Sequence, residues 1–588
     1  MQKAEKPLWD NSRFHFAIIT CLAFILYIPT LSYQLTYYDD ATLIDFMQTF
    51  IKGHHAFYEI FAQNVFGSAE KGTDSYYRPV LTLSFYLNIL AGGTSPAAFH
   101  LVNIMLHALA GCLVYAMMKK FKFDRKLSLA GSLMLIAHPA LAQAVAWIPG
   151  RNDSLLTILS LTSLLFLAEY IEQRKSRSFL LHLFFFSLAL LTKETAVLLP
   201  VLFAISVNIF LRNTTSELLP VREKIPGTKK LFVSWFILIA SFLFLRQVVA
   251  GSSIGLPLRF TLVNFIGNLP AIIQYTGKML LPFELSTFPV LQNTSYLFGI
   301  ITIALTGYLL YVSKLIRFNY LLLAVSWWLI FLLPAILRTT DEYESVFLEH
   351  RLYFPFIGFL LLWVETDFIK KINWSSPYTK ISAAAILILF SALTFINCKN
   401  YQNELSYWSR AVATSPNASF AYRGLGTSYY TSGKTPDAEK AYLMAMQLNP
   451  NLKDVRNNLG RIYMNNGNPQ KAELLFREEL KINPASAVTY YNLALLQLDQ
   501  KKLPEAESLI RKSLSLQPDY LDAQNDLCVI LAMQKRYEEA ATLCIQVLVQ
   551  HPDYASARQN LILIFKSWND SEKVQQYKDM LQQKGIRL

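Results

Sequence analysis

The last third of the chain repeats with a period of 34 residues, and this period constrains the fold more than any other feature. Prolines recur at that spacing, at Pro416, Pro450, Pro484, Pro518 and Pro552. Leucines recur at the same spacing, at Leu425, Leu459, Leu493, Leu527 and Leu561. A helix–turn–helix unit of this length buries its apolar face only against the next copy. The segment 401–588 is therefore predicted to form an α-solenoid.

The most regular copy, AYRGLGTSYYTSGKTPDAEKAYLMAMQLNP, resembles the tetratricopeptide (TPR) repeat. Leu425 and Tyr429 would share one face of its first helix, and Ala438 is small where the two helices are expected to cross. Pro450 ends the second helix. Four copies are clear, and a weaker fifth copy at 557–586 lacks the final proline. Such repeats predict a surface for protein or peptide binding rather than chemistry.

Residues 1–400 differ in kind, because they contain apolar runs of about 20 residues, the length needed to cross a bilayer. The first run, 14–33, is long and lacks a small-residue cleavage site, so we expect a span rather than a removed signal peptide. The net charge of +13 comes largely from short loops between runs and does not predict nucleic-acid binding. The predicted fold is all-α: a polytopic membrane helix bundle (1–400) followed by the TPR solenoid (401–588).

Loop charge sets the predicted topology. If 79–91 and 264–281 lie in the membrane interface, eleven spans keep every basic loop on the cytoplasmic side. The first external loop, 34–96, and the solenoid then share the non-cytoplasmic side. The predicted spans lie near 14–33, 97–118, 127–147, 154–171, 178–192, 195–211, 231–249, 296–313, 320–337, 352–369 and 380–397.

Charged residues gather at the external ends of these spans. They are Asp39, Asp40, Arg78, Arg151, Asp153, Lys193, Glu194, Glu349, His350 and Arg351. Each one alone fits a solvated loop, a helix cap or an interfacial anchor. Together, an acidic pair and four Lys or Arg residues on one membrane face predict a pocket. In it a carboxylate could act as general base and the cations could hold a phosphate.

Two further groups of polar or reactive side chains lie on predicted helices. His100, Asn103 and His107 share one helical face, but the two histidines are seven residues apart. That is about 10 Å of rise, too far for one metal ion, and structural hydrogen bonding is the favoured reading. Cys528 and Cys544 take inward positions in one TPR copy, as buried thiols or as one disulfide in an oxidising compartment.

The order of several motifs resembles a known family. The motifs are YYDD, YRP, FHLVNIMLHAL, HPALAQAVAWIPGRND, LTKETAVLLP and EHRLYFPFIGF, followed by TPRs. This arrangement resembles the transmembrane-and-TPR (TMTC) proteins, which belong with the C-type glycosyltransferases. Enzymes of that class are membrane proteins that use a lipid-phosphate-linked sugar. The resemblance also implies a first external loop with interfacial helices.

The resemblance implies roles for individual residues. Asp39 or Asp40 would be the base that deprotonates the acceptor hydroxyl, with Asp39 favoured. Arg351 would bind the donor phosphate, because its motif is similar to the family's E-R-x-L-Y-x-P. This chain departs from that pattern by carrying His350 between Glu349 and Arg351, which changes the register of the acidic residue. Further phosphate-binding candidates are Arg78, Arg151 and Lys193. The supporting residues would be Glu349, His350, Asp153, Glu194, His100 and His107.

The predicted function is transfer of a sugar from a polyprenyl-phosphate-linked donor to a hydroxyl group, as on Ser or Thr of a protein. Mannose is the sugar implied by the family's animal members. The TPR groove is expected to bind the acceptor protein or peptide, through Asn457, Asn458, Asn492 and Asn525. Whether a divalent metal binds the adjacent aspartates stays open. The expected location is a bacterial inner membrane rather than the endoplasmic reticulum.

Two other functions stay open at this point. The bundle could anchor a non-catalytic TPR scaffold for assembly or secretion, although an anchor does not need so many charged residues on one face. The bundle could also transport lipid-linked sugars. A transporter predicts internal repeats and polar residues through the depth of the bilayer, and the sequence shows neither clearly.

Overall fold

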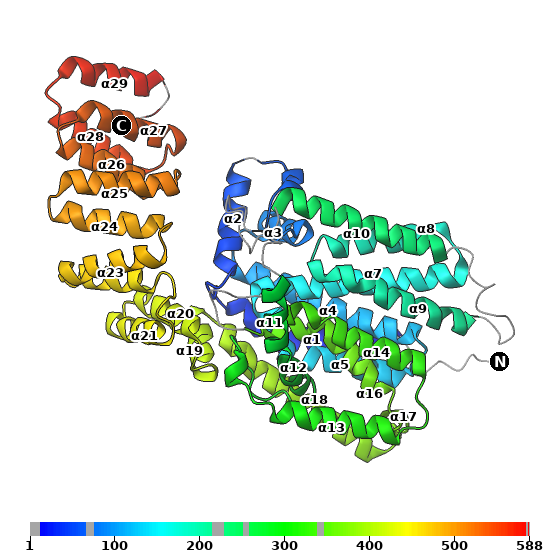
Figure 1. Cartoon of the computed structure of the whole chain (residues 1–588). Coiled ribbons are helices and arrows are strands. Elements are labelled where there is room, and N and C mark those ends of the chain that lie inside the picture. Colours follow the sequence, from blue (N-terminus) through cyan, green and yellow to red (C-terminus); the bar gives the residue numbers. More distant parts are fainter. Residues whose placement is uncertain are drawn as a thin grey trace. The chain divides into compact units, whose positions relative to one another are not determined.

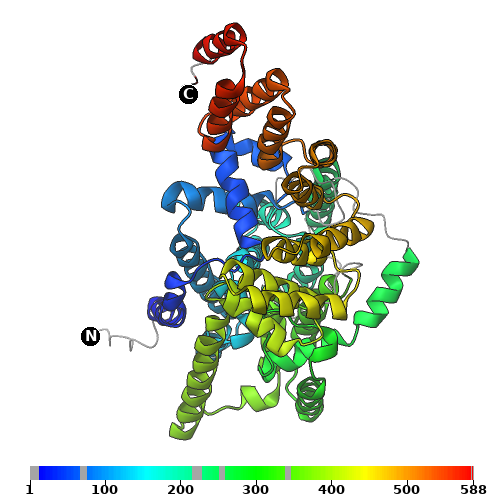
Figure 2. The ribbon, with the colours of Figure 1, turned by 90° about the vertical axis from the view of Figure 1, so that its left-hand side faces the viewer.

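The computed structural model describes residues 12–53, 55–65, 76–214, 228–250, 258–337, 346–583 and 586. Within these ranges the regular structure is helical, apart from one isolated β-bridge between Val290 and Val346. Contacts divide the chain into two compact units, Met1–Ala418 and Ser419–Leu588. Figures 1 and 2 show the helices of each unit. The predicted all-α class is confirmed.

The first unit is a bundle of apolar helices connected by shorter ones. Its α-helices are α1 (Ser12–Tyr27), α2 (Asp40–Lys52), α3 (Pro79–Gly92), α4 (Pro96–Lys120), α5 (Arg125–Ala137), α6 (Gln143–Ala146), α7 (Arg151–Gln173), α8 (Ser176–Leu190), α9 (Leu199–Thr214), α10 (Thr228–Ala250), α11 (Leu258–Asn268), α12 (Ala271–Leu280), α13 (Leu297–Val312), α14 (Phe318–Ile330), α15 (Leu333–Ile336), α16 (Tyr353–Val364), α17 (Asp367–Lys370), α18 (Pro377–Cys398) and α19 (Glu404–Thr414). Its 3-10 helices are η2 (Ile28–Ser32), η3 (Phe57–Ala62), η4 (Pro139–Leu141), η5 (Ile148–Gly150), η6 (Glu194–Leu198), η7 (Leu291–Asn293), η8 (Glu349–Leu352) and η9 (Lys399–Tyr401).

Many of these helices suit a membrane. Among the described residues, seven are long and apolar enough to cross one, and the bent pair of α5 with η4 and α6 would make eight. The seven are Ser12–Ser32, Pro96–Lys120, Ile148–Gln173, Glu194–Asn213, Thr228–Ala250, Phe318–Ile336 and Pro377–Tyr401. Helices α3, α8 and α13 are apolar but shorter. The chain is a multi-pass membrane protein, while the count of eleven spans stays a prediction.

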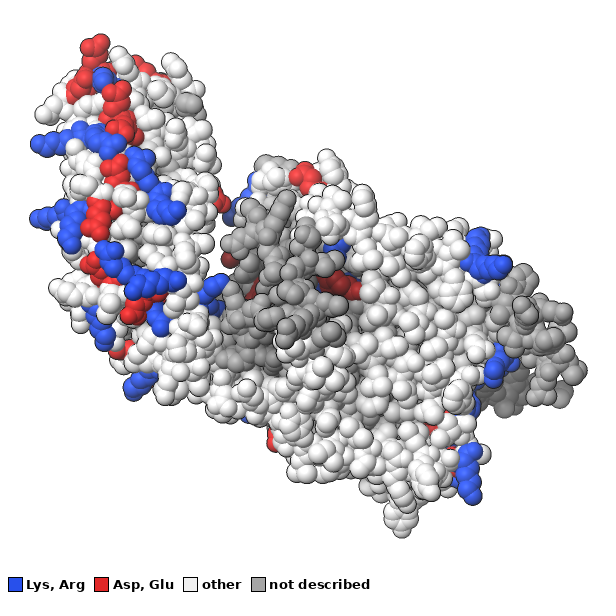
Figure 3. Space-filling view, viewed as in Figure 1, with Lys and Arg blue, Asp and Glu red and all other residues white. Residues whose placement is uncertain are grey.

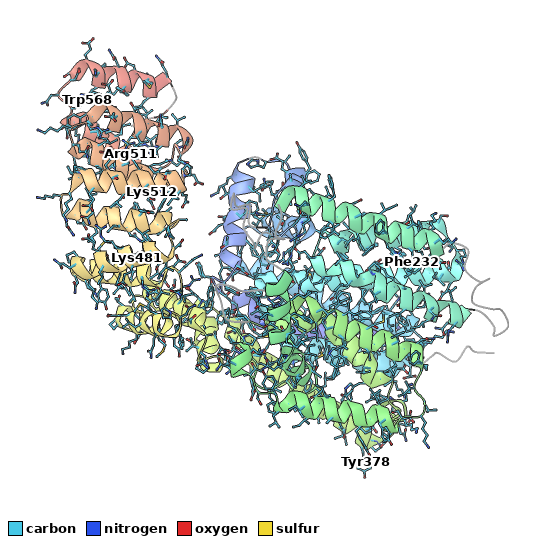
Figure 4. The ribbon with its side chains drawn as sticks, in the orientation of Figure 1. Phe232, Tyr378, Lys481, Arg511, Lys512 and Trp568 are labelled. Carbon is cyan, nitrogen blue, oxygen red and sulfur yellow. The ribbon has the colours of Figure 1, made fainter. Side chains whose placement is uncertain are left out.

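The outer surface of the bundle is apolar. In the most hydrophobic window of α10, 11% of residues are buried, and Phe232, Phe236 and Phe244 are exposed. Phe232 and Tyr378, at the start of α18, project from the bundle (Figure 4). The visible face of the bundle is largely uncharged, and its Lys and Arg side chains gather mainly at one end (Figure 3). Such a surface is stable against lipid but not against water.

The second unit is the solenoid predicted from the 34-residue period. Each repeat supplies a first and a second helix. The pairs are α20 (Ser419–Thr431) with α21 (Thr435–Leu448), α22 (Val455–Asn465) with α23 (Pro469–Ile482), α24 (Ala487–Asp499) with α25 (Leu503–Leu516), α26 (Leu521–Met533) with α27 (Tyr537–Gln550), and α28 (Ala555–Ser567) with α29 (Ser571–Gln583). In contrast to the bundle, the visible face of the solenoid carries charges of both signs, including the projecting Lys481, Arg511 and Lys512 (Figures 3 and 4).

Small residues let the two helices of a repeat approach each other. A Cβ atom added at Gly426 would lie 2.6 Å from the ring of Tyr442. The same addition at Gly460 would lie 2.6 Å from the ring of Phe476, one repeat later. Ala438 is fully buried at the crossing of the first pair. The repeated sequence pattern therefore reflects repeated close packing rather than a shared chemical role.

Candidate active site

Asp40, the second acidic residue of the first loop, is buried at the start of α2. Its carboxylate accepts hydrogen bonds from the backbone N–H of Thr36 (2.6 Å), the hydroxyl of Thr36 (3.0 Å) and the backbone N–H of Ala41 (3.0 Å). Burial raises the pKa of Asp40 to about 6, although these hydrogen bonds oppose the increase. Asp40 thus holds the turn that leads into α2.

Asp39 has a different environment from its neighbour. It takes the N-cap position of α2 with φ of 68°, in the left-handed region, and its side chain makes no capping hydrogen bond. The side chain is half-buried, whereas Asp40 is closed to solvent. A non-glycine residue held in this conformation costs about 1–3 kcal/mol and persists only where its surroundings impose it. Of the two carboxylates, Asp39 is the one an incoming hydroxyl could reach.

Tyr38 anchors this strained loop in a box of aromatic rings. Its ring stacks on Trp147 with centroids 5.6 Å apart, and the Trp147 indole N–H donates to the Tyr38 carbonyl at 3.1 Å. Phe288, Tyr407 and Trp408 surround the ring, at centroid distances of 5.9, 5.8 and 5.5 Å. The four surrounding rings come from three distant parts of the sequence, and sequence reasoning did not find them as partners of Tyr38.

Two ion pairs bring predicted site residues together beside η6. Arg78 donates to Glu194 through Nε and Nη2, at 2.9 and 2.8 Å from Oε2. Lys193 Nζ lies 2.6 Å from Asp153 Oδ1. Residues from the start of α3, the first turn of α7 and the segment before α9 thus meet in one cluster.

Arg351 extends this cluster electrostatically. Burial lowers the pKa of Lys193; Asp153 counteracts this, while the positive charges of Arg78 and Arg351 lower the pKa further. Three cations therefore act on one small region that holds two carboxylates, Asp153 and Glu194. Lys193 and Asp153 are buried and the other members are partly exposed, and the cluster has an excess of positive charge that suits an anionic group such as a phosphate.

His350 connects this cluster to the aromatic box. Its Nε2 lies 4.0 Å from Asp153 Oδ2, and its ring centroid lies 5.4 Å from that of Trp147. Its backbone N–H donates to Oε1 of Gln143 at 3.0 Å. The next residue, Arg351, donates from Nη1 to the Val346 carbonyl at 3.1 Å. The cation cluster is thus linked through His350 and Trp147 to Tyr38, the neighbour of Asp39 in sequence.

Glu349 points to a partner that the sequence analysis missed. Its Oε1 lies 2.8 Å from Nζ of Lys278 on α12 and accepts the backbone N–H of Ser286 at 2.9 Å. Burial raises the pKa of Glu349, and Lys278 opposes the increase. In this chain, the carboxylate directly before the extra His350 therefore pairs with Lys278. The one sign of Lys278 in the sequence was a lysine within the largely apolar stretch 264–281.

Arg151 proves to be a packing residue rather than a phosphate ligand. Its guanidinium is fully buried and donates to the side-chain oxygens of Asn103 (2.8 Å) and Asn88 (2.7 Å) and to the Phe99 carbonyl (3.0 Å). It also lies over the Phe85 ring, 4.5 Å from the centroid. Arg78 and Arg351 are partly exposed, whereas Arg151 is closed to solvent, so the position of Arg151 does not favour it as a ligand of the donor phosphate.

The two histidines of α4 also lie inside the bundle. His107 Nδ1 lies 2.6 Å from the Tyr353 hydroxyl and Nε2 lies 3.3 Å from the Ile136 carbonyl. His100 is buried, its ring edge-on to Tyr33 with centroids 6.1 Å apart. Neither histidine belongs to the cation cluster. The part of the chain that the structure describes contains no group of three or more His, Cys, Asp or Glu arranged to hold a metal ion.

Three of the predicted acceptor-binding asparagines join neighbouring TPR repeats. Asn457, Asn492 and Asn525 are each at most 6% exposed. The Asn492 amide N–H donates to Asn457 Oδ1 at 2.8 Å, and Asn560 donates to Asn525 Oδ1 at 2.9 Å. Asn458 is partly exposed. The sequence located these amides on the first helices of the repeats, but not their pairing with one another.

Comparison with known proteins agrees with this architecture. Residues 80–242 match the family described as dolichyl-phosphate-mannose-protein mannosyltransferase, and residues 423–487 and 497–562 match tetratricopeptide repeats. A protein O-mannosyl-transferase of Caenorhabditis elegans is 25% identical over 74% of this chain and 62% of its own length. The chain is a TMTC-like family member. The human protein O-mannosyl-transferase TMTC3 is 24% identical over 65% of this chain and 49% of its own length.

The TMTC-like chain matches only part of these relatives. Over 30% of its length it is 32% identical to the Drosophila melanogaster protein O-mannosyl-transferase Tmtc1, and this match covers 21% of that protein. It thus spans less than two thirds of the length of each relative. Among solved structures, MamA matches 27% of the TMTC-like chain and 94% of its own length, at 20% identity and a TM-score of 0.25.

Proposed function

We propose that this TMTC-like chain is a membrane glycosyltransferase that transfers a sugar to a hydroxyl group of a protein. The observation that carries the proposal is the convergence of Arg78, Lys193 and Arg351 on one region, joined through His350 to the loop of Asp39. A cation cluster and a half-buried carboxylate are the two parts that such a transfer needs. The names of the relatives favour mannose as the sugar and protein as the acceptor.

The donor in this proposal is a polyprenyl-phosphate-linked sugar, and its phosphate binds Arg351, with Lys193 and Arg78 beside it. A guanidinium presents two parallel N–H groups to phosphate oxygens, which an ammonium group cannot do. A lipid-linked donor also fits a multi-pass bundle whose outer surface is apolar. The polyprenol lies in the bilayer while the charged phosphate stays at the membrane surface.

Asp39 is the general base of the proposed reaction. It takes the proton of the acceptor hydroxyl as the hydroxyl oxygen forms a bond to the anomeric carbon of the sugar. The bond between that carbon and the phosphate oxygen breaks, and the polyprenyl phosphate leaves with the electron pair. Arg351 stabilises the charge that develops on the phosphate. Asp40 instead fixes the turn, because its oxygens already accept three hydrogen bonds.

The direct test is to incubate the purified full chain in lipid nanodiscs with radiolabelled polyprenyl-phosphate sugars, mannose among them, and candidate acceptor proteins. Asp39→Asn should lower transfer by about 10²–10⁴-fold, the usual contribution of a general base. Arg351→Lys should weaken donor binding, and Arg351→Ala should weaken it further. Wild-type rates from both Asp39→Asn and Asp40→Asn would show that the base lies elsewhere.

The solenoid, in this proposal, recruits the acceptor polypeptide on the non-cytoplasmic side of the membrane. TPR surfaces bind extended chains, and the basic loops favour this topology. Deleting 421–588 should abolish transfer to protein but spare slow hydrolysis of the donor. A cysteine at the exposed position Asp437 should react with a membrane-impermeant maleimide in intact cells. Labelling only after permeabilisation would reverse the proposed topology.

A further inference from the structure

Helix α19 (Glu404–Thr414) directly precedes the first TPR repeat in sequence, yet it belongs to the bundle unit. It packs along residues 285–288. The Tyr407 hydroxyl donates to the Thr287 carbonyl at 3.1 Å, and the Thr287 hydroxyl donates back to the Tyr407 carbonyl at 2.8 Å. Tyr407 and Trp408 are both buried. This helix is therefore part of the wall of the bundle.

The first contact of α19 with the candidate site is through Tyr38. Tyr407 and Trp408 both contact this ring, at centroid distances of 5.8 and 5.5 Å, while Trp147 stacks on it. Tyr37 and Asp39, the residues on either side of Tyr38, both have positive φ, of 52° and 68°. Two left-handed residues that flank one partly buried ring need support from their surroundings, since each conformation is costly alone. Part of that support comes from α19.

The second contact runs to the phosphate-binding motif. Thr287, which exchanges two hydrogen bonds with Tyr407, also accepts the Gln143 amide N–H at 3.1 Å. The other end of Gln143 accepts the backbone N–H of His350 at 3.0 Å, directly before Arg351. Both polar atoms of one buried amide are used, so its orientation is fixed. A continuous chain of hydrogen bonds thus joins α19 to the residue before Arg351.

We propose that α19 is a positioning element of the active site: Tyr407 and Trp408 hold Asp39 and the His350–Arg351 motif in a fixed arrangement. The catalytic part of this proposal rests on the proposed function, but the effect of α19 on the arrangement of Asp39 and the His350–Arg351 motif can be measured without any sugar transfer. Neither aromatic residue needs to touch a substrate. Misplacement of a reacting group by about 1 Å can cost roughly 10²-fold in rate, so small shifts of the loop should be visible in kinetics.

The test compares variants of the full chain in nanodiscs by hydrogen–deuterium exchange and by transfer from polyprenyl-phosphate mannose. Trp408→Ala removes a side of the box, Trp408→Phe restores an aromatic ring, and Tyr407→Phe removes only the hydroxyl bonded to Thr287. Ala413→Ser, at an exposed position of the same helix, is the matched control.

Trp408→Ala should speed exchange in 34–44 without changing exchange in 419–588. It should lower kcat by about 10²-fold with little change in the donor KM, and Trp408→Phe should recover most of the loss. Tyr407→Phe should speed exchange in 346–352, and this variant decides the question if Trp408→Ala does not fold. Unchanged exchange in both loops, or equal effects of Ala413→Ser, would overturn the proposal. If the wild type transfers no sugar, the proposed function fails and exchange alone decides the role of α19.

Discussion

The buried pair of Lys278 and Glu349 gives a quantitative prediction, because one substitution should produce a pH-dependent loss of stability. Glu349 is fully buried, and Lys278 Nζ lies 2.8 Å from its carboxylate. In Lys278→Met the aliphatic stem is kept and the charge is removed. The carboxylate then keeps the backbone N–H of Ser286 as its remaining hydrogen-bond donor among those shown by the structure.

The expected loss of stability depends on whether Glu349 of the variant stays charged or binds a proton. Breaking one side of a buried pair typically costs about 3–5 kcal/mol. The variant can avoid an unpaired charge by binding a proton, at about 1.4 kcal/mol for each pH unit above the unfolded pKa of about 4.3. At about pH 7.5 this route costs roughly 4 kcal/mol, so both estimates agree.

The sign of the pH dependence is fixed by the pKa. Burial raises the folded-state pKa of Glu349, and loss of Lys278 should raise it further. A raised pKa means that the contribution of the group is fully present below the unfolded pKa and is lost as pH rises through the folded pKa. The gap between Lys278→Met and wild type should therefore grow with pH, by up to about 1.4 kcal/mol per unit.

Unfolding of the full chain in mixed detergent–SDS micelles at several pH values measures this gap. The double variant Lys278→Met with Glu349→Gln should recover most of the stability at neutral pH and lose the pH dependence. A destabilisation of Lys278→Met that is the same at acidic and neutral pH would refute the reasoning. So would a double variant that is no more stable than the single one.

Three further outcomes are expected. Burial raises the pKa of Asp40 to about 6, so its contribution to stability should be lost as pH rises through 6, by roughly 3 kcal/mol. The protection of α2 from hydrogen exchange should fall over the same pH range, and it should not fall in Asp40→Asn. Gly426→Ala should destabilise the solenoid by about 1–3 kcal/mol through overpacking against the Tyr442 ring, as measured by limited proteolysis. Cys528 and Cys544 are buried free thiols and should react with iodoacetamide only on unfolding.

The parts of the fold that follow from local periodicity were predictable. The 34-residue spacing located all five helix pairs, because the positions of Gly426 and Pro450 fix where two helices cross and where one ends. Apolar length located the bundle in the same way. These features depend on residues close in sequence, so no knowledge of distant partners was needed.

The site was predictable as a set of charged residues, but not as a set of contacts. Asp39 and Asp40 are adjacent and chemically equal in sequence, and their environments diverge only in the fold, where Asp40 is buried with three hydrogen bonds and Asp39 is half-buried with a left-handed backbone. Arg151 carries the charge expected of a phosphate ligand, yet its guanidinium N–H groups already donate to acceptors on α3 and α4. Lys278 lies 71 residues from Glu349 in the sequence, and no local sequence pattern predicts such a distant pair.

The contacts of α19 also change where the chain can safely be divided for expression. The repeat pattern suggests a solenoid fragment that begins near residue 401, and such a fragment would include α19. Tyr407 and Trp408 would then lose Tyr38 and Phe288 as neighbours and face water, which favours aggregation. A fragment that begins at Ser419 avoids this exposure, and exchange of solenoids between related proteins should use the same junction.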